Sequence, residues 1–511
     1  MSLNRKAFPQ IPFFLLLIGL LWSSSLISQG AYRIQIMPGA AEMRYSKNIN
    51  EAIRFIGNPV FYHDGAYLYC DSAWLMEESN TVDCFGKVRI KSSDTLNLYG
   101  KFLHYDGNTK LANLRDDVRL VDNQTTLTTD VMLFDRNTQI ASYVTWGKIV
   151  NKDNTLTSRK GYYHTDTKKM YFKENVIVRN PDYTMNSDTL LYNTLSRITY
   201  FLGPTIIKGK DNYIYCENGE YNRNTNKSRF SENALLVDDN RRLTGDSLYY
   251  DSNEDYGKAV RNVILTDTVK DVILKGHFAE YWKNKGVAYI TQMALAILGE
   301  KNDTLYLHAD TLKATFDTTN QETRNLFAYE NARFYRNDLQ GECDSLYYSF
   351  ADSVITMFRS PVIWSDKNQL TADTIRIFTG EKTIKLMKLY NSAFIINKDS
   401  TTTFNQIKGR NMTGHFADNR LVRIDVEGNA ETIYYIREDN KEMIGINMAK
   451  GSRMHLYIED NKIQRITYFD KPDGNLFPEK DVSADQRLIK GFHWLQERRP
   501  VTWPEVFRRF E

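Results

Sequence analysis

Hydrophobic and polar side chains alternate along most of this chain. In LTGDSLYYD (243–251), Leu248 and Tyr250 fall on one side, and Ser247 and Tyr249 fall on the other. Near copies keep the same register: MNSDTLLYN from Met185 and GECDSLYYS from Gly341. A strict period of two is the signature of a strand with two unlike faces, and helical spacing is absent from these stretches. The pattern therefore predicts an all-β protein.

Two short phrases recur along the chain. The first is an Asp followed by Ser or Thr, an aliphatic residue and an aromatic one, as in the stretches above. The second is a Gly, Glu or Ser followed by Asn, Pro or Lys and then Val, Ile or Ala. It recurs at Gly57, Gly86, Asp116, Gly147, Glu174, Gly203, Glu232, Arg261, Glu330, Ser360, Ser392 and Gly428, with a degenerate copy at Gln292. The starts are about 30 residues apart, which is the period of a repeat architecture with about thirteen copies.

Each copy has room for about two strands and two turns. Turn signals fall between the strands, for example DGN at Asp106, NRNTN at Asn222 and DSNED at Asp251. No copy of this size can bury an apolar face alone, so neighbouring copies must stack, as in a solenoid. We therefore predict an elongated repeat array, with the following boundaries. Residues 31–56 are an N-terminal lead-in, 57–299 and 300–470 are two repeat regions, and 471–511 are a C-terminal tail.

The C-terminal tail differs from the repeats. Ser483 with Gln486 three residues later predicts a helix start with a capping box. Leu488, Ile489, Phe492 and Leu495 would form an apolar stripe on that short helix. The tail would act as a lid over the last rung of the sheet. Alternatively, its arginines Arg498, Arg499, Arg508 and Arg509 would dock a partner or an anionic membrane surface.

The N-terminus carries the pattern of an export signal. Arg5 and Lys6 precede an apolar run from Ile11 to Trp22, and small and polar residues follow it. This order predicts a signal peptide over residues 1–30, because the run is short for a membrane span of about 20 residues. No Cys follows the apolar run, so a lipid anchor at this site is not expected.

Composition narrows the function. The 66 Lys and Arg against 63 Asp and Glu leave a net charge of only +3, which gives no footprint for nucleic acid. The 13% of aromatic residues favours strands. Only Cys70 and Cys84, among four cysteines, are near each other in sequence, and the sequence does not decide whether they form a disulfide. The absence of a CxxC pattern argues against a structural zinc site.

The repeated aspartates are the sharpest chemical feature. Paired carboxylates can hydrolyse glycosidic bonds, so a row of Asp could line the cleft of a carbohydrate-active enzyme. Catalysis, however, needs one special site, whereas this motif occurs in many copies. We therefore interpret the Asp and its Ser or Thr as caps for backbone donors at a strand start. Five histidines, His104, His164, His277, His415 and His455, occupy similar slots without matching ligands, so we expect no metal site, no cofactor and no catalytic residue.

The two phrases together resemble the OstA-like family, the periplasmic lipopolysaccharide-transport proteins of the organic-solvent-tolerance group. The likeness runs from about Gly57 to Phe469, and ENALLVDDNRRLTGDSLYYD (232–251) and SPVIWSDKNQLTADTI (360–375) carry it best. The motifs are short, and their specificity comes from their number. The array is much longer than that of the single-domain bridge proteins of the family. The chain thus looks like a multi-domain bridge component.

The resemblance implies an open, folded-over β-sheet (a β-jellyroll) with an apolar groove inside. It also implies a non-enzymatic carrier of lipopolysaccharide or a similar lipid in the periplasm of a Gram-negative bacterium. Unpaired end strands would join other transport components, or further copies of the chain. The residues expected on the groove face are Met132, Phe134, Leu190, Tyr192, Leu248, Tyr250, Leu312, Leu346, Tyr348, Ile375 and Ile377. The same side chains would also fit a closed core.

Two further functions stay open from the sequence, a carbohydrate-active β-helix enzyme and a structural or adhesive surface rod. In addition, Asp-Ser/Thr-aliphatic resembles the O-glycosylation sequence used on exported proteins by Bacteroidetes-type bacteria. The candidates for this modification are Thr95, Thr189 and Ser247.

Overall fold

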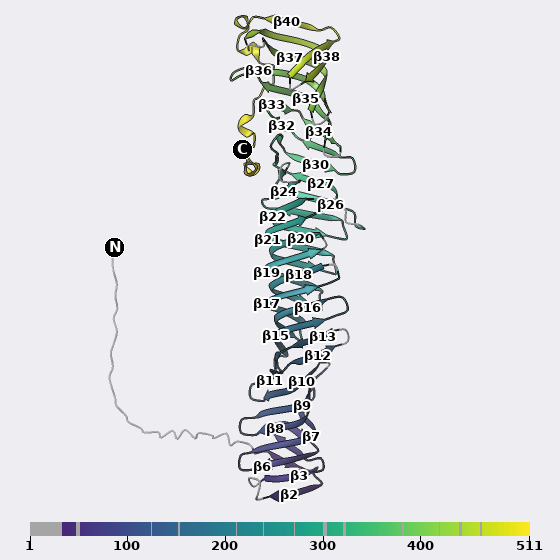
Figure 1. Ribbon diagram of the computed structural model, residues 1–511, viewed down its shortest axis with the longest axis vertical. Coiled ribbons are helices and arrows are strands. Elements are labelled where there is room, and N and C mark those ends of the chain that lie inside the picture. The colour runs from purple at the N-terminus through teal and green to yellow at the C-terminus, as the bar shows by residue number, and fades with distance from the viewer. Residues whose placement is uncertain are drawn as a thin grey trace, which may run out of the picture. The chain divides into compact units, whose positions relative to one another are not determined.

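The computed structural model of the chain is built from β-strands (Figure 1). It describes residues 33–46, 52–123, 125–151, 154–210, 212–238, 240–269, 271–299, 304–319, 323–380, 383–417, 420–438, 442–459 and 462–510. Forty strands and four short 3-10 turns lie within these ranges, and no α-helix does. The all-β prediction is confirmed, whereas the predicted signal peptide lies outside the described residues.

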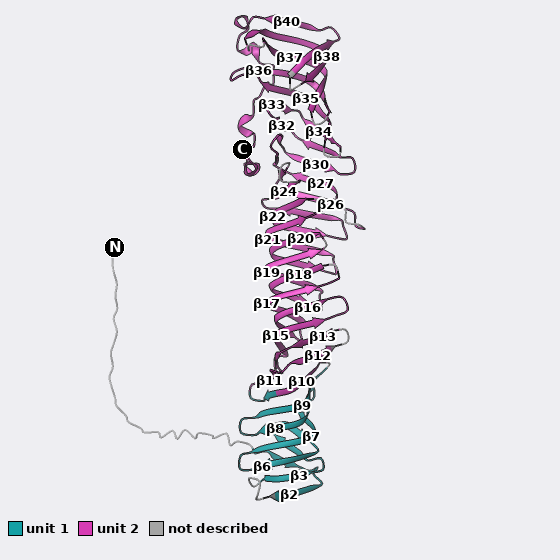
Figure 2. Cartoon of the chain, in the orientation of Figure 1, with its two compact units in different colours: residues 1–123, 133–137 teal, residues 124–132, 138–511 magenta. Residues whose placement is uncertain are grey.

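Two compact units divide the chain, residues 1–123 with 133–137 and residues 124–132 with 138–511 (Figure 2). The first nine strands lie in unit 1. They are β1 (Gln35–Met37), β2 (Glu42–Ser46), β3 (Ala52–Ile56), β4 (Val60–His63), β5 (Ala66–Tyr69), β6 (Ser72–Met76), β7 (Thr81–Lys91), β8 (Leu96–Asp106) and β9 (Leu111–Asp122). Strand β10 (Thr125–Asp135) contributes residues to both units.

The other strands belong to unit 2, and most pair antiparallel with near neighbours in sequence. Up to the middle of the chain they are β11 (Ile140–Tyr143), β12 (Gly147–Asn151), β13 (Asn154–Ser158), β14 (Lys160–His164), β15 (Lys169–Arg179), β16 (Thr184–Asn193), β17 (Ile198–Lys208), β18 (Asn212–Asn222), β19 (Lys227–Asp238), β20 (Arg241–Asp251), β21 (Tyr256–Asp267), β22 (Val272–Trp282), β23 (Val287–Thr291), β24 (Leu295–Leu298) and β25 (Leu305–His308). They continue as β26 (Thr311–Phe316), β27 (Thr323–Tyr329), β28 (Ala332–Tyr335), β29 (Gln340–Cys343), β30 (Ser345–Ser349), β31 (Val354–Phe358), β32 (Val362–Ser365), β33 (Asn368–Thr371), β34 (Thr374–Thr379), β35 (Ile384–Lys398), β36 (Phe404–Ala417), β37 (Arg420–Arg437), β38 (Met443–Glu459), β39 (Lys462–Phe469) and β40 (Asp473–Phe477).

The predicted turn residues close the hairpins and tie neighbouring turns together. Asp106, Asn222 and Asp251 each accept hydrogen bonds on Oδ1 from backbone N–H groups two or three residues later, at 2.8–3.3 Å. Asn253 then donates from Nδ2 to the backbone oxygen of Thr225 in the preceding turn, at 2.7 Å. Such side-chain bonds to the local backbone are the reason why Asp and Asn favour turns.

The second repeated phrase marks a corner at which the strand bends. In most copies two consecutive residues at its start, or one residue before it, both adopt positive φ, as in Glu232 (57°) and Asn233 (59°), a conformation that Asn, Asp and Gly tolerate best. In unit 2 such pairs are Glu174–Asn175, Glu232–Asn233, Arg261–Asn262, Gln292–Met293, Glu330–Asn331, Arg359–Ser360, Asn391–Ser392 and Gly428–Asn429, and Asp470–Lys471 is a further pair without the phrase. The register of the ladder shifts at these bends, for example between Ser231 and Ala234. The degenerate copy at Gln292 is therefore a true corner.

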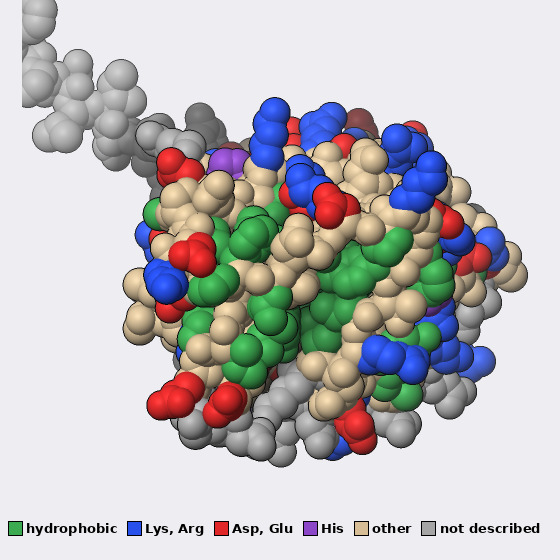
Figure 3. Space-filling view, turned by 90° about the horizontal axis from the view of Figure 1, so that it is seen from above, with side chains coloured by type: hydrophobic (Ala, Val, Ile, Leu, Met, Phe, Trp, Pro, Cys, Tyr) green, Lys and Arg blue, Asp and Glu red, His purple; other side chains and the backbone are tan. Residues whose placement is uncertain are grey.

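The corners fold each strand pair of unit 2 into two walls. The first wall carries Leu190, Leu248, Leu312, Leu346 and Ile375 on its inner face. The second wall carries an inner row of Val178, Met185, Ile207, Ile214, Leu236, Leu243, Leu265, Leu274, Ala296, Leu307, Phe334, Gly341, Ile363, Leu370, Ile395 and Ile407. At the end that carries β40, hydrophobic side chains gather in the hollow of the molecule (Figure 3).

The predicted short helix of the C-terminal tail is wrong. The capping bond forms, because the backbone N–H of Ser483 donates to Oε1 of Gln486 at 3.1 Å, but only a 3-10 turn follows (η2, Asp485–Arg487). Leu488 is already extended (φ −123°, ψ 124°) and Gly491 has a φ of 99°. Three further 3-10 turns are η1 (Glu479–Asp481), η3 (Gln496–Arg498) and η4 (Trp503–Phe507). The segment is irregular because its backbone is satisfied partly by local turn hydrogen bonds and partly by side chains of the sheet.

Candidate functional site

The interior of unit 2 gathers most of the groove residues expected from the sequence. Leu190, Leu248, Leu312, Leu346 and Ile375 lie on one cross-strand row. Each is at most 7% exposed. The copies of the first phrase, although unequally spaced along the chain, thus contribute to one continuous apolar line on the first wall.

A second row on the same face lies farther from the corner. It contains Tyr192, Tyr250, Tyr348 and Ile377. Ile377 is buried, whereas Tyr250 is 37% exposed and donates its hydroxyl to Oδ1 of Asp255 at 3.0 Å. Partial burial, and then the bond to Asp255, raise the pKa of Tyr250 to about 12. The remaining two candidates, Met132 and Phe134 of β10, are both fully buried.

The second wall differs in exposure along its length. From Val178 to Leu274, its inner row is half-buried, except for the buried Met185. From Ala296 onward the row is buried except for the half-buried Leu370, and Leu307 and Ile363 are at most 3% exposed. An apolar inner face that water still reaches therefore runs along β15–β22, while the interior beyond β24 is mostly closed.

The repeated aspartates meet the corner residues of a neighbouring strand. Oδ1 of Asp246 accepts a hydrogen bond from Nδ2 of Asn262 at 3.0 Å, and its other oxygen pairs with Arg261 at 3.2 Å. Asp310 accepts in the same way from Asn331 at 2.8 Å. Asp246 acts from inside β20 and Asp310 directly before the start of β26, and both bind side chains of a neighbouring corner rather than the backbone donors that we expected them to cap.

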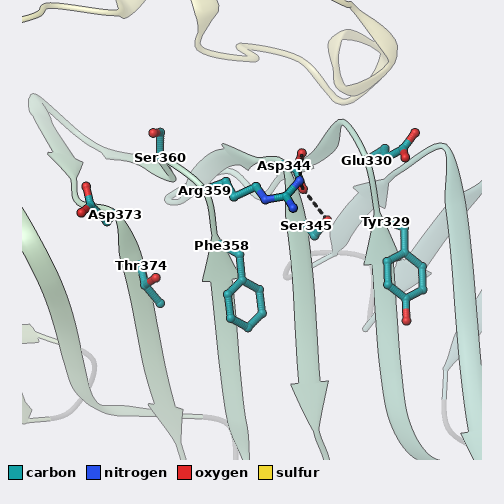
Figure 4. A pocket seen from close by; sticks show the side chains of 9 residues that line it. All are labelled: Tyr329, Glu330, Asp344, Ser345, Phe358, Arg359, Ser360, Asp373 and Thr374. Atoms are coloured by element: carbon teal, nitrogen blue, oxygen red, sulfur yellow. Dashed lines mark hydrogen bonds and ion pairs between the residues drawn. The ribbon is translucent and has the colours of Figure 1, made fainter.

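One hollow along this line of corners has a volume of about 860 Å³ (Figure 4). Its lining includes Glu330, Asp344, Arg359 and Asp373. Arg359 pairs with Asp344 at 3.3 Å, and the Ser345 hydroxyl donates to the same carboxylate at 2.6 Å. The pair of Arg359 with Asp344 repeats that of Arg261 with Asp246, so we interpret the carboxylate as a structural group that stabilises the bend.

Histidines and cysteines occupy structural positions. His415 and His455 both approach the carboxylate of Asp425, at 2.7 and 3.5 Å, and Arg423 occupies the same carboxylate. Within the described ranges, no group of three His, Cys, Asp or Glu side chains is arranged to hold a metal ion. Cys70 and Cys84 are buried free thiols, and a hydrogen bond between them, together with burial, raises the pKa of Cys84.

The three candidate modification sites differ in accessibility. Thr95 is exposed in the bend between β7 and β8. The hydroxyl of Thr189 donates to its neighbour Asp188 at 2.9 Å, and that of Ser247 accepts from Nε of Arg229 at 3.1 Å. Only Thr95 lies outside a strand.

Sequence reasoning missed the row of side chains that holds the C-terminal segment. Residues 478–510, called the strap below, cross the outer face of the second wall, where Gln340, Gln369 and Gln406 are each at most 2% exposed. The signal was present: the stretches VIW (362–364) and AFII (393–396) are apolar on both faces, which predicts that both are covered.

Ionic and aromatic contacts hold the far end of the strap. Arg333 donates to the backbone oxygens of Arg498 and Arg508, and Arg498 pairs with Glu342 at 2.7 Å. Burial raises the pKa of Glu342 and lowers that of Arg333. Tyr306 stacks on Trp503 at 5.2 Å.

His308 is buried under this end of the strap. Its ring lies 4.6 Å from that of Phe507, and Nδ1 is 2.7 Å from the backbone oxygen of Ala294. Burial lowers the pKa of His308, and this effect outweighs the bond to Ala294 and the charge of Asp310, which both raise the pKa. The charges of Arg509 and Arg333, which also face the ring, lower it further.

Comparisons with known proteins relate part of the chain to a family. Residues 36–188 match the family model described as OstA-like protein. One solved structure that is similar is LptH from Pseudomonas aeruginosa, described as the LptA homologous periplasmic component of the conserved lipopolysaccharide transport device. It is 13% identical, and the match covers 27% of this chain and 95% of that one, with a TM-score of 0.22. No curated protein sequence matches the chain. None of the described residues forms a helix with the length and apolar character needed to cross a membrane.

Proposed function

We propose that this protein is a non-enzymatic lipid carrier of the periplasm, which holds the acyl chains of lipopolysaccharide or a similar lipid between its two walls. The observation that carries the proposal is the half-buried apolar row from Val178 to Leu274, which faces the buried row of the first wall. An acyl chain gains about 0.8 kcal/mol for each methylene that leaves water, so it needs an unbroken apolar surface.

The OstA-like match supports this function, because proteins of that family transport lipopolysaccharide. It covers residues 36–188, and the two repeated phrases continue the same pattern to about residue 469. The carrier would aid movement of the lipid to the outer membrane or its assembly there. The repeated wall suits this task, since a path for a lipid needs the same surface at every step and no reacting group.

End strands provide a means of joining other components. Of the two edges of β2, one pairs with β3, and in the described part of the chain no strand pairs with the other. At the C-terminal end, β39 pairs only with β38 among the described strands. An unpaired edge can add a strand of a similar fold, so both ends would join transport components or further copies of the chain. Modification of Thr95, Thr189 and Ser247 remains a separate prediction.

Site-specific photo-crosslinking tests the proposal. A photoreactive residue at Leu248 or at Leu243 would face the interior, whereas one at Ser247 would face outward. In cells that make lipopolysaccharide, we expect lipid adducts at the two interior positions and none at Ser247. Adducts at Ser247 alone, or at no interior position while the protein is folded, would show that the interior is not a lipid path.

A further inference from the structure

The strap contacts the sheet without joining its ladder. Within the described part of the chain, the backbone–backbone hydrogen bonds of residues 478–510 all close local turns of that segment. The sheet ladder of β25–β36 is complete without it. The strap is therefore attached to the wall, and it is not a strand of the wall.

Glutamine side chains supply the hydrogen bonds that a neighbouring strand would otherwise supply. Nε2 of Gln406 donates to the backbone oxygen of Arg487 and its Oε1 accepts from the N–H of Ile489, both at 2.8 Å. Gln369 makes the same two bonds six residues farther along the strap, to the backbone oxygen of His493 and from the N–H of Leu495, both at 2.7 Å. Both therefore bind the O of residue i and the N–H of residue i+2, as a strand neighbour would.

These glutamines stand on one outer row of the second wall. The row runs Gln340, Trp364, Gln369, Ile396, Gln406 and Ile433. Because Gln369 and Gln406 bind backbone atoms, their contacts do not depend on the strap's side chains. The strap side chains that make specific contacts with the wall are apolar ones such as Ile489, which is 3% exposed, and Arg498, which pairs with Glu342.

We propose that this outer face, over β25–β36, is a docking track for a protein segment with aromatic and basic side chains, and that the strap is its resident, releasable occupant. Release leaves the ladder intact and uncovers a row of apolar side chains and unpaired amides. That surface fits a partner segment of the same chemistry. The same outer row continues beyond the strap onto Ile297 and Ile273, which are only half-buried. The inference does not depend on the lipid-carrier proposal.

A labelled synthetic peptide of residues 479–510 tests the track in the full-length chain. Ile489→Ser with Trp494→Ser weakens the chain's own strap and leaves the wall unchanged. We expect this variant to bind the peptide at least tenfold more tightly than the unmodified chain, because the resident strap competes. Adding Gln369→Leu and Gln406→Leu should reduce that binding at least tenfold. Tyr213→Leu, on the same row but outside the strap, is the matched control and should change nothing.

The proposal is wrong if the folded strap variant does not bind the peptide, or instead binds lipid vesicles or dimerises without binding it. Should the variant fail to fold, hydrogen exchange in the unmodified chain decides. The amides of Ile489 and Leu495 should then exchange at least tenfold faster than those in the middle of β36. Exchange of both sets together would show that the strap is an inseparable part of the fold.

Discussion

Truncating one interior residue in each zone of unit 2 would measure how open the interior is. Ile375 is 0% exposed between Met357 and Leu389, which are at most 2% exposed. Ile375→Ala removes three carbons worth about 0.8 kcal/mol each and leaves a cavity, so it should cost about 3 kcal/mol. Leu243 is half-buried between half-buried neighbours, so Leu243→Ala should cost only about 1 kcal/mol.

Hydrogen exchange is the suitable assay, because a stacked repeat opens locally and need not unfold in two states. Amides of β34 should exchange about 100-fold faster in Ile375→Ala, and those of β20 about fivefold faster in Leu243→Ala. The control Ile264→Ala, on the outer face and 37% exposed, should stay within about 0.5 kcal/mol of the parent. Equal losses at Ile375 and Leu243 would refute the reasoning, since they would mean that the interior is as closed along β15–β22 as it is at β34.

Three other predictions follow from the contacts of single residues. Because burial lowers the pKa of His308, strap docking should be fully stable above pH 6.5 and weaken as the pH falls from 6.5 through the lowered pKa. Hydrogen exchange of the strap amides, corrected for the intrinsic rate, should show this pH dependence. His308→Gln should abolish the pH dependence. Asp344→Asn breaks a largely exposed ion pair, so hydrogen exchange near the corner should reveal a loss of local stability of at most about 1 kcal/mol. A far larger loss than at the other corners would favour a special functional role for this carboxylate. Gly161→Ala would place a Cβ 2.4 Å from the Tyr143 ring and should cost more than about 2 kcal/mol, whereas Gly257→Ala, with its nearest atom at 3.9 Å, should cost far less by the same assay.

The local parts of the fold follow from the sequence because local physics decides them. Alternation places Leu248 on the inner face, and Asx bonds place Asp251 in a turn. The second phrase identifies most corners, including the degenerate one at Gln292, but not the one at Asp470–Lys471. What the sequence could not show is that the two phrases meet. The bond from Asn262 to Asp246 joins residues 16 apart, and it depends on the register of the pairing strands.

The half-open interior and the strap could not be predicted for a different reason. Leu243 and Leu307 occupy the same inner row and are the same residue, yet Leu243 is half-buried and Leu307 is only 3% exposed, so residue identity does not set exposure. The predicted helix failed because Ile489 is drawn to Gln406, a contact between residues 83 apart in sequence. Helix propensity describes only the competition between local conformations, whereas here a contact with a residue distant in sequence decides the conformation.

The position four residues before the repeated Asp departs from the repeat in a way that bears on the outer face of the wall. The position four residues before the repeated Asp is Arg242 in one copy and Gln340 and Gln369 in two later ones. An arginine there stays exposed, whereas the glutamines are buried and bind the strap. A wall that only had to enclose lipid would have no use for buried amides on its outer face, because each must find a partner or cost about 1–3 kcal/mol. The glutamines therefore give the outer face a second task, which is to bind the strap.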